Sequence, residues 1–242
     1  MTRREFFPLL TAPLFAETQG ESPSRSVVIV RDISPSYKTS PPIVAKLSEI
    51  LHEVGPGDVL TIIELGGRFS PEGCVKVQCT MPRVTAGVLS PVKRLDDWRR
   101  NQLRLDAVWR RVEANQRSIE SYVRTPPPVK DPTPLFETLA YSAAIMKAAV
   151  GTRTVLLFSD LIQDSGGVSS PLPPKDVMDF SGVSGFALFV PWNKEFSKRA
   201  AAWRRWFVAS GATDFEMLDG AQSQVRKVLD KNAVPRVLPQ RF

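Results

Sequence analysis

The chain has 242 residues, of which 43% are hydrophobic and 24% are charged, and this composition excludes an intrinsically disordered protein and suits one large α/β domain. The formal net charge of +7 favours acidic partners, although the 32 basic residues are interspersed with 25 acidic ones and an ordinary basic surface explains the charge more simply. A single histidine, His52, excludes histidine-rich zinc sites and offers little for a Ser-His-Asp triad.

Residues 1–25 are similar to an export signal followed by a linker. Arg3 and Arg4 form a twin-arginine pair, and the apolar stretch over residues 8–16 ends at a small residue suited to signal cleavage. This segment predicts an exported protein, periplasmic or extracellular, with its domain over residues 26–242. The apolar stretch is short and carries two prolines, so an N-terminal arm packed on a cytoplasmic domain is the alternative. No apolar run in the sequence is long enough to span a bilayer.

The first part of the predicted domain alternates buried strands with a helix. A β-branched run over residues 26–31 is typical of a central strand that is buried on both faces. Apolar residues at helical spacing predict a helix over residues 42–54, and the glycines and proline that follow it end the helix. Two further strands are predicted over residues 58–65 and 72–80, and the alternating pattern of the second suits an edge of the sheet.

The two cysteines, Cys74 and Cys79, fall in this predicted edge strand. An odd separation along a strand directs their side chains to opposite faces, and roughly 16 Å of extended chain lies between them. The spacing predicts free thiols, and it excludes a disulfide framework and a Cys-x-x-Cys metal motif.

An unusually long helical segment is predicted over residues 91–124. Its apolar residues are spaced alternately three and four apart and form a narrow seam, while arginines occupy the other faces. Unbroken, the segment would reach roughly 45–50 Å, which is longer than a helix needs to be to cover a sheet. Two interpretations stay open: the segment kinks or splits and its seam is ordinary core, or it forms an arm with a surface for a partner.

Alternating helices and strands complete the chain after a stiff, proline-rich loop over residues 125–134. The remaining predicted elements are helices over residues 135–150, 196–207 and 221–231 and strands over residues 154–160, 185–190 and 215–218. The whole pattern predicts an α/β fold: a doubly wound, mostly parallel sheet of about six strands with helices on both faces and the long helical segment between the third and fourth strands. The basic, aromatic helix over residues 196–207 is expected to pack on the sheet rather than to lie on a membrane.

Three short polar segments fall where a predicted strand ends or a predicted helix begins. Asp32, Ser34 and Ser36 follow the first strand, Thr133 precedes a helix, and Asp160 ends a buried strand. Ligands of open α/β sheets bind at the carboxyl ends of strands where the winding direction reverses, so the three segments meet if the two strands are neighbours. Carboxylate and hydroxyl oxygens suit Mg²⁺, or Mn²⁺ or Ca²⁺, rather than zinc.

The pattern Asp32-x-Ser34-x-Ser36, followed by Thr133 and Asp160, resembles the metal-ion-dependent adhesion site (MIDAS) of von Willebrand factor type A (vWA) domains. The resemblance covers the chain from about residue 26 onward and implies a Rossmann-like vWA fold. It implies that the three hydroxyl groups bind one divalent cation directly, that the two aspartates act through water, and that an acidic residue of a protein partner completes the coordination. The chain would then be a metal-dependent protein-binding module and not an enzyme.

The sequence departs from the vWA pattern at the residue before Thr133 and at the residue after Asp160. The family often has glycine before the threonine and after the final aspartate, whereas this chain has Pro132 and Leu161. The proline is expected to stiffen the threonine loop, and the leucine is expected to place bulk at the rim of the site. The departures are compatible with a degenerate site that keeps the fold and binds no metal.

The residues are also compatible with an enzyme and with a metal-independent binding protein. Asp32, Glu64 and Asp160 all fall near carboxyl ends of predicted strands, and three acids would hold Mg²⁺ in a nuclease-like phosphodiesterase. The hydroxyl groups have no role in that reaction and no glycine-rich phosphate loop is present, so nucleic acid is not the expected partner. A metal-independent protein would instead bind its partner through the arginine-rich segment over residues 91–124.

Overall fold

The computed structural model describes residues 25–35, 37, 40–165, 168–190, 194–218, 229, 236–238 and 240. The predicted export signal, apart from Arg25, and the predicted helix over residues 221–231, apart from Leu229, lie outside this part of the chain. Ser36, one of the predicted metal ligands, lies outside it as well.

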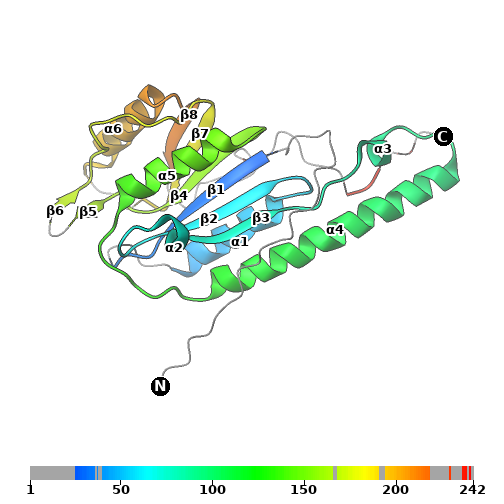
Figure 1. The fold of residues 1–242 in the computed structure, drawn as a ribbon, viewed down its shortest axis with the longest axis horizontal. Helices are drawn as coiled ribbons and strands as arrows, with labels where there is room; N and C mark the ends of the chain where they lie inside the picture. Colours follow the sequence, from blue (N-terminus) through cyan, green and yellow to red (C-terminus); the bar gives the residue numbers. More distant parts are fainter. Residues whose placement is uncertain are drawn as a thin grey trace, which may run out of the picture.

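Figure 1 shows a central six-stranded sheet between layers of helices. Its strands are β1 (Arg25–Asp32), β2 (Val59–Leu65), β3 (Val75–Thr80), β4 (Thr152–Phe158), β7 (Val183–Leu188) and β8 (Asp214–Leu218). They lie in the spatial order β3-β2-β1-β4-β7-β8, and every neighbouring pair is parallel except β2 and β3. The strands are wound outward in both directions from β1 and β4, which confirms the predicted doubly wound, mostly parallel, Rossmann-like fold.

Helices bury both faces of the sheet. They are α1 (Pro41–Glu53), α4 (Leu95–Arg124), α5 (Leu135–Ala148) and α6 (Phe196–Ala209). Ile29 of β1 belongs to the core beneath α1 and α4, and its neighbour Val28 belongs to the core beneath α5 and α6. Because both of its faces meet a helix layer, β1 is buried along its whole length, as its β-branched sequence predicts.

Helix α6 packs on the sheet, as expected from its aromatic stripe. Phe196, Trp203 and Phe207 are buried, and the Phe207 ring stacks on Phe215 of β8 with 4.1 Å between ring centroids. The stripe therefore belongs to the core rather than to a membrane-facing surface. None of the helices in the described ranges combines the length and the hydrophobicity needed to cross a bilayer.

The third strand begins later than the sequence predicts. Residues Pro71–Cys74 form a short helix, α2, because proline suits its first turn and the Ser70 hydroxyl accepts a hydrogen bond from the Gly73 amide at 3.3 Å. Cys74 therefore precedes β3 instead of lying in it. Both Cys74 and Cys79 are free, as predicted.

Three short elements are absent from the sequence prediction. They are α3 (Ala86–Leu89) and the antiparallel hairpin of β5 (Gln163–Ser165) and β6 (Val168–Ser170). Each is three or four residues long, so neither a helical nor a strand period is visible in its sequence.

Helix α4 is a single helix of 30 residues between β3 and β4, as predicted. It begins at Leu95 rather than at residue 91, and Asp96 and Asp97 in its first turn favour that start because they interact with the positive end of the helix dipole. At its other end, the carbonyl of Thr125 accepts a hydrogen bond from the Arg31 side chain at 3.4 Å.

The N-terminal half of α4 extends beyond the sheet, and residues 95–109 are called the arm below (Figure 1). Its Leu105 is fully buried against Val88 of α3 and Leu238. The C-terminal half of α4 packs on the sheet through residues such as Val112. The segment does not split, although its seam is largely core, and its N-terminal half projects as an arm. That the arm offers a surface for a partner stays a prediction.

Candidate functional site

The switch point of the sheet brings together the ends of β1 and β4. These strands pair in parallel with Arg31 opposite Phe158, so Asp32 and Ser159, the next residues, lie side by side at the carboxyl edge. Asp32 is fully buried, and Asp160 is 3% exposed. The expectation that the first strand and the strand before Asp160 are neighbours is therefore confirmed.

Hydroxyl-bearing residues surround the carboxylate of Asp32. Its Oδ1 accepts a hydrogen bond from the Ser34 amide at 2.9 Å, and its Oδ2 accepts one from the Ser159 hydroxyl at 2.7 Å. Ser159 is itself positioned by the Leu161 amide, which donates to its Oγ at 3.0 Å. These bonds fix the orientation of the Asp32 side chain.

Burial raises the pKa of Asp32 to about 6. Hydrogen bonds from Ser34 and Ser159 stabilise the charged form and oppose the rise, while the negative charge of Asp160 adds to it. Two carboxylates thus lie within electrostatic reach of each other in a buried setting. A cation between them would favour the charged form of both.

The Asp160 loop is tied to α6. The Asp160 carboxylate accepts a hydrogen bond from the Ile162 amide at 3.0 Å, and its main-chain carbonyl accepts one from the Arg199 guanidinium. Arg199 is 5% exposed, and burial lowers its pKa, whereas the charges of Asp160 and Glu195 act in the opposite direction. A buried guanidinium from α6 therefore fixes the main chain at the predicted metal ligand.

Leu161 does not occupy the rim of the site, contrary to the sequence prediction. Its side chain is fully buried in the core beneath α5 and α6. The residue adopts a φ of 58°, a conformation that favours glycine and that costs a leucine about 1–3 kcal/mol. The left-handed turn directs the side chain into the core, where burial of its apolar surface offsets that cost.

Thr133 lies in a loop that is bonded to both neighbouring segments. Its carbonyl accepts hydrogen bonds from the Leu135 amide at 2.9 Å and from the Asp164 amide at 3.1 Å. Three residues earlier, the Lys130 amide donates to the carbonyl of Ile33 at 3.1 Å. Thr133 is 2% exposed, so the loop holds it between the segment after β1 and the segment after β4.

Glycines after β2 permit this close approach. The Gly67 amide donates to the Pro132 carbonyl at 2.7 Å, and a Cβ added to Gly66 would lie 2.7 Å from Cγ1 of Ile33. Gly67 also has a φ of 78°, which favours glycine. The pair is thus required for the segments that carry Asp32 and Thr133 to pack together.

The Gly66→Ala substitution is expected to lower the free energy of unfolding by about 1–3 kcal/mol, because its methyl group overlaps Ile33. Urea unfolding followed by circular dichroism measures the loss. Gly87→Ala is the matched control, since a Cβ there meets no atom within 4 Å and the residue lies in α3. Equal stabilities of the two variants would contradict the close packing.

Three residues of the site are absent from the sequence prediction: Tyr37, Ser159 and Arg199. Ser159 adjoins Asp160, but only the register of β1 and β4 shows that it meets Asp32. Tyr37 is buried, its hydroxyl donates to the Leu188 carbonyl at 3.3 Å, and burial and the charges of the two aspartates raise its pKa. The sequence could have indicated that Arg199 is buried, because this residue falls on the same helical face as the buried aromatic residues of α6.

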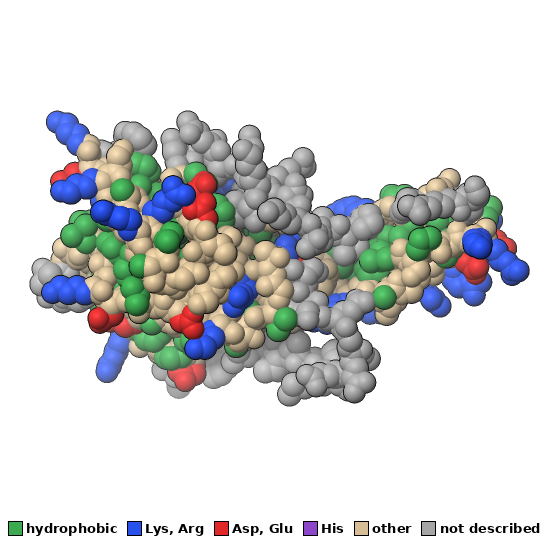
Figure 2. All heavy atoms as spheres, turned by 90° about the horizontal axis from the view of Figure 1, so that it is seen from above, with side chains coloured by type: hydrophobic (Ala, Val, Ile, Leu, Met, Phe, Trp, Pro, Cys, Tyr) green, Lys and Arg blue, Asp and Glu red, His purple; other side chains and the backbone are tan. Residues whose placement is uncertain are grey.

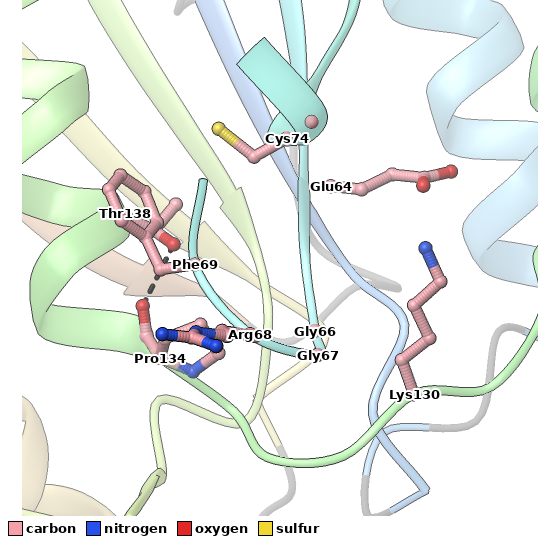
Figure 3. Close-up of a pocket in the computed structure, with 10 residues that line it drawn as sticks. Glu64, Gly66, Gly67, Arg68, Phe69, Cys74, Lys130, Pro134 and Thr138 are labelled. Carbon is pink, nitrogen blue, oxygen red and sulfur yellow. Dashed lines mark hydrogen bonds between the residues drawn. The ribbon is translucent and has the colours of Figure 1, made fainter. Parts of the chain in front are cut away.

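A pocket of about 150 Å³ lies beside this site at the same edge of the sheet. Gly66 and Gly67 form part of its wall, and Lys130 and Arg68 extend from the main chain on either side of them (Figure 3). Pro134, which follows Thr133, also lines the pocket. Lys130 and Arg68 thus place two positive charges beside the candidate site, and Glu64, which also lines the pocket, places one negative charge there.

Glu64 does not join the two aspartates, so the three-acid arrangement of a nuclease-like enzyme is not formed. Its carboxylate accepts a hydrogen bond from the Tyr122 hydroxyl of α4, and Figure 3 shows it directed away from Thr138 of α5. Within the described ranges, no group of three or more His, Cys, Asp or Glu side chains is suited to hold a metal ion. The predicted site depends on only two carboxylates, with hydroxyl groups as its remaining donors.

No family model and no curated protein matches this sequence. Among solved structures, the chain is similar to the pilus adhesin SpaC from Lactobacillus rhamnosus GG in its open conformation (11% identity, 87% of this chain, 30% of that chain, TM-score 0.48). It is also similar to the ArnB paralog VWA2 from Sulfolobus acidocaldarius (12% identity, 87% of this chain, 45% of that chain, TM-score 0.44). The chain spans less than half the length of either protein, and the likeness concerns the fold alone.

Proposed function

We propose that this chain is a metal-dependent protein-binding module of the vWA kind. The observation that carries the proposal is the position of two buried aspartates, Asp32 and Asp160, beside hydroxyl-bearing residues at the switch point of the sheet. The residues that would hold the cation are Asp32, Ser34, Ser36, Thr133 and Asp160. The chain would act by binding and not by catalysis.

The donor chemistry fits a hard divalent cation. Carboxylate and hydroxyl oxygens are ligands that Mg²⁺, Mn²⁺ and Ca²⁺ accept, and none of the proposed ligands is a thiol or an imidazole. In the described part of the chain Asp32 forms no ion pair, and the Arg199 guanidinium donates to the main-chain oxygen of Asp160. A bound cation would relieve the repulsion between the two carboxylates that contributes to the raised pKa of Asp32.

The expected partner group is a carboxylate. Hydroxyl ligands are neutral, so a cation bound mainly by Ser34, Ser36 and Thr133 keeps affinity for a further anionic ligand. The exposed basic residues Lys130 and Arg68 beside the site favour an acidic residue in the same place. Export of the protein, inferred from residues 1–25, remains a prediction.

Calorimetric titration of Mg²⁺ and Mn²⁺ into the protein tests the proposal. We expect saturable binding that is lost in the Asp32→Ala/Asp160→Ala variant, because both carboxylates that balance the cation charge are removed. Circular dichroism verifies that the variant is folded. The Asp176→Ala/Asp179→Ala variant removes the same charge from exposed positions and is expected to bind the metal normally. Absence of binding to the folded parent protein, or equal binding by all three proteins, would contradict the proposal.

A further inference from the structure

The outward surface of α4 is basic along most of its length. Between residues 99 and 124 its exposed side chains include no acidic residue. They include seven arginines: Arg99, Arg100, Arg104, Arg110, Arg111, Arg117 and Arg124. The acidic residues of this stretch, Asp106, Glu113 and Glu120, are half-buried at the flanks of the helix. Figure 2 shows the arm as a projection with Lys and Arg side chains along one edge and at its tip.

Four of these arginines have no ion pair among the described residues: Arg104, Arg110, Arg111 and Arg117. The others pair within the helix, Arg99 with Asp96, Arg100 with Asp97 and Arg124 with Glu120. The four remaining arginines lie within 14 residues of helix, residues 104–117, a rise of about 20 Å. Each has five donors in a planar fork that matches the geometry of a carboxylate.

Small side chains separate these arginines into two rows. Ala107, Ala114 and Ser121 recur at seven-residue spacing along the middle of the exposed surface, and Ala107 and Ala114 are exposed. By helical geometry, Arg104 and Arg111 lie on one side of this seam, and Arg110 and Arg117 lie on the other. The exposed surface of the helix thus carries a row of small residues, one in every seven, with arginines on both sides of it.

The chemistry of this surface selects one kind of partner. A second helix can approach the small seam to about 8–10 Å between axes, and its acidic residues would then reach the flanking arginines. Leu103 is the single large apolar side chain that is strongly exposed within residues 99–124, so the surface lacks the apolar face that inserts into a membrane. The tryptophans of the arm, Trp98 and Trp109, pack inward and offer no stacking platform for bases.

We propose that the outward surface of α4 docks an acidic helix of a partner protein, in an arrangement in which glutamate or aspartate side chains flank a seam of small residues. This contact is separate from the proposed metal site and needs no cation. It uses exposed arginines that form no ion pair within the described part of the domain.

Fluorescence anisotropy in the presence of EDTA tests this docking. The probe is a labelled 21-residue helical peptide with alanine at seven-residue spacing and glutamate on both sides of it. We expect the Arg104→Gln/Arg111→Gln variant to bind it about threefold to thirtyfold more weakly than the parent protein, from the usual strength of two exposed ion pairs. The matched control is Lys198→Gln/Arg205→Gln, which removes two exposed charges at the same spacing from α6 and is expected to leave the affinity unchanged.

The comparison ligands separate docking of a helix from general attraction to negative charge. A peptide of the same composition with scrambled positions is expected to bind more weakly. The proposal is overturned if the parent protein does not bind the designed peptide, if the α6 variant is weakened as much as the α4 variant, or if the scrambled peptide binds equally well. It is also overturned if duplex DNA or phosphatidylserine vesicles bind the arginine surface more tightly than the peptide. The Asp32→Ala/Asp160→Ala variant is expected to bind the peptide normally, so failure of the metal-site proposal leaves this one standing.

Discussion

In the absence of divalent cations, the Asp32→Asn variant is expected to gain stability relative to the parent protein as the pH rises from 4 to 7, by about 2–3 kcal/mol in total. The pKa of Asp32 is raised to about 6 in the folded protein from an ordinary value of 3.8. Between these values the unfolded chain loses its proton first, so the contribution of Asp32 to stability is full below about pH 4 and is lost as the pH passes 6. Asparagine does not titrate, so the Asp32→Asn variant does not lose this contribution to stability as the pH rises.

Urea unfolding at several pH values in EDTA measures this difference. Asp176→Asn, which makes the same substitution at an exposed position, is the control. Saturating Mg²⁺ should reduce the loss of stability of the parent protein between pH 4 and 7, because the cation favours the charged form of Asp32. It should have little effect on the pH dependence of the stability of Asp32→Asn. Parallel curves for the parent protein and Asp32→Asn would show that burial of Asp32 does not disfavour its charged form.

The Trp203→Ala substitution is expected to lower the free energy of unfolding by about 3–5 kcal/mol, the range for truncation of a large buried aromatic side chain. Trp203 is fully buried at the centre of the core beneath α5 and α6. Its ring meets those of Trp206 and Phe207 with centroids 5.8 and 6.2 Å away, and its indole N–H donates to the Pro171 carbonyl at 3.1 Å. Both the packing and this hydrogen bond are lost.

The control for Trp203 is the same substitution on the arm. Trp98 is half-buried in the small cluster between α4 and Leu238, so Trp98→Ala removes less buried surface and is expected to cost less. Chemical unfolding of both variants measures the difference. Hydrogen exchange at the Ile162 amide should also rise in Trp203→Ala, because Arg199, one turn earlier on α6, holds the Asp160 loop. An equal or smaller loss at Trp203 than at Trp98 would contradict the packing of α6.

The sequence predicts the fold well because its strongest periodic signals coincide with the buried elements. Apolar residues run through β1 and β4 because both faces of these strands are buried, and they recur at helical spacing in α1 because one face of that helix is buried. Burial of this kind is visible in the sequence pattern. The short helix α2 escapes prediction because a Ser70 cap and a proline override the strand pattern around Cys74. Elements of three or four residues, such as β5, are shorter than the period that would reveal them.

At the candidate site, the sequence identifies the residues that follow strands but not the contacts between strands. Asp32 and Asp160 lie at the switch point as predicted, whereas the contact between Asp32 and Ser159 depends on strand register, which no local pattern encodes. The orientation of Leu161 depends on a single left-handed turn, so its prediction as a rim residue is wrong. Charge near the site is likewise set by tertiary packing, which turns Glu64 toward Tyr122 and away from Asp32.

Helix α4 separates two potential binding surfaces by a fixed distance. Its C-terminal end meets β1 at Arg31, next to Asp32, and about 32 Å of helix lies between Thr125 and Arg104 on the arm. Two ligands can therefore occupy the domain without touching. A partner that carries both an acidic helix and a carboxylate that binds the metal gains avidity only if its own structure or linker spans that distance. Because α4 is a single continuous helix, the distance is fixed, and acidic partners of other dimensions bind through one surface at a time.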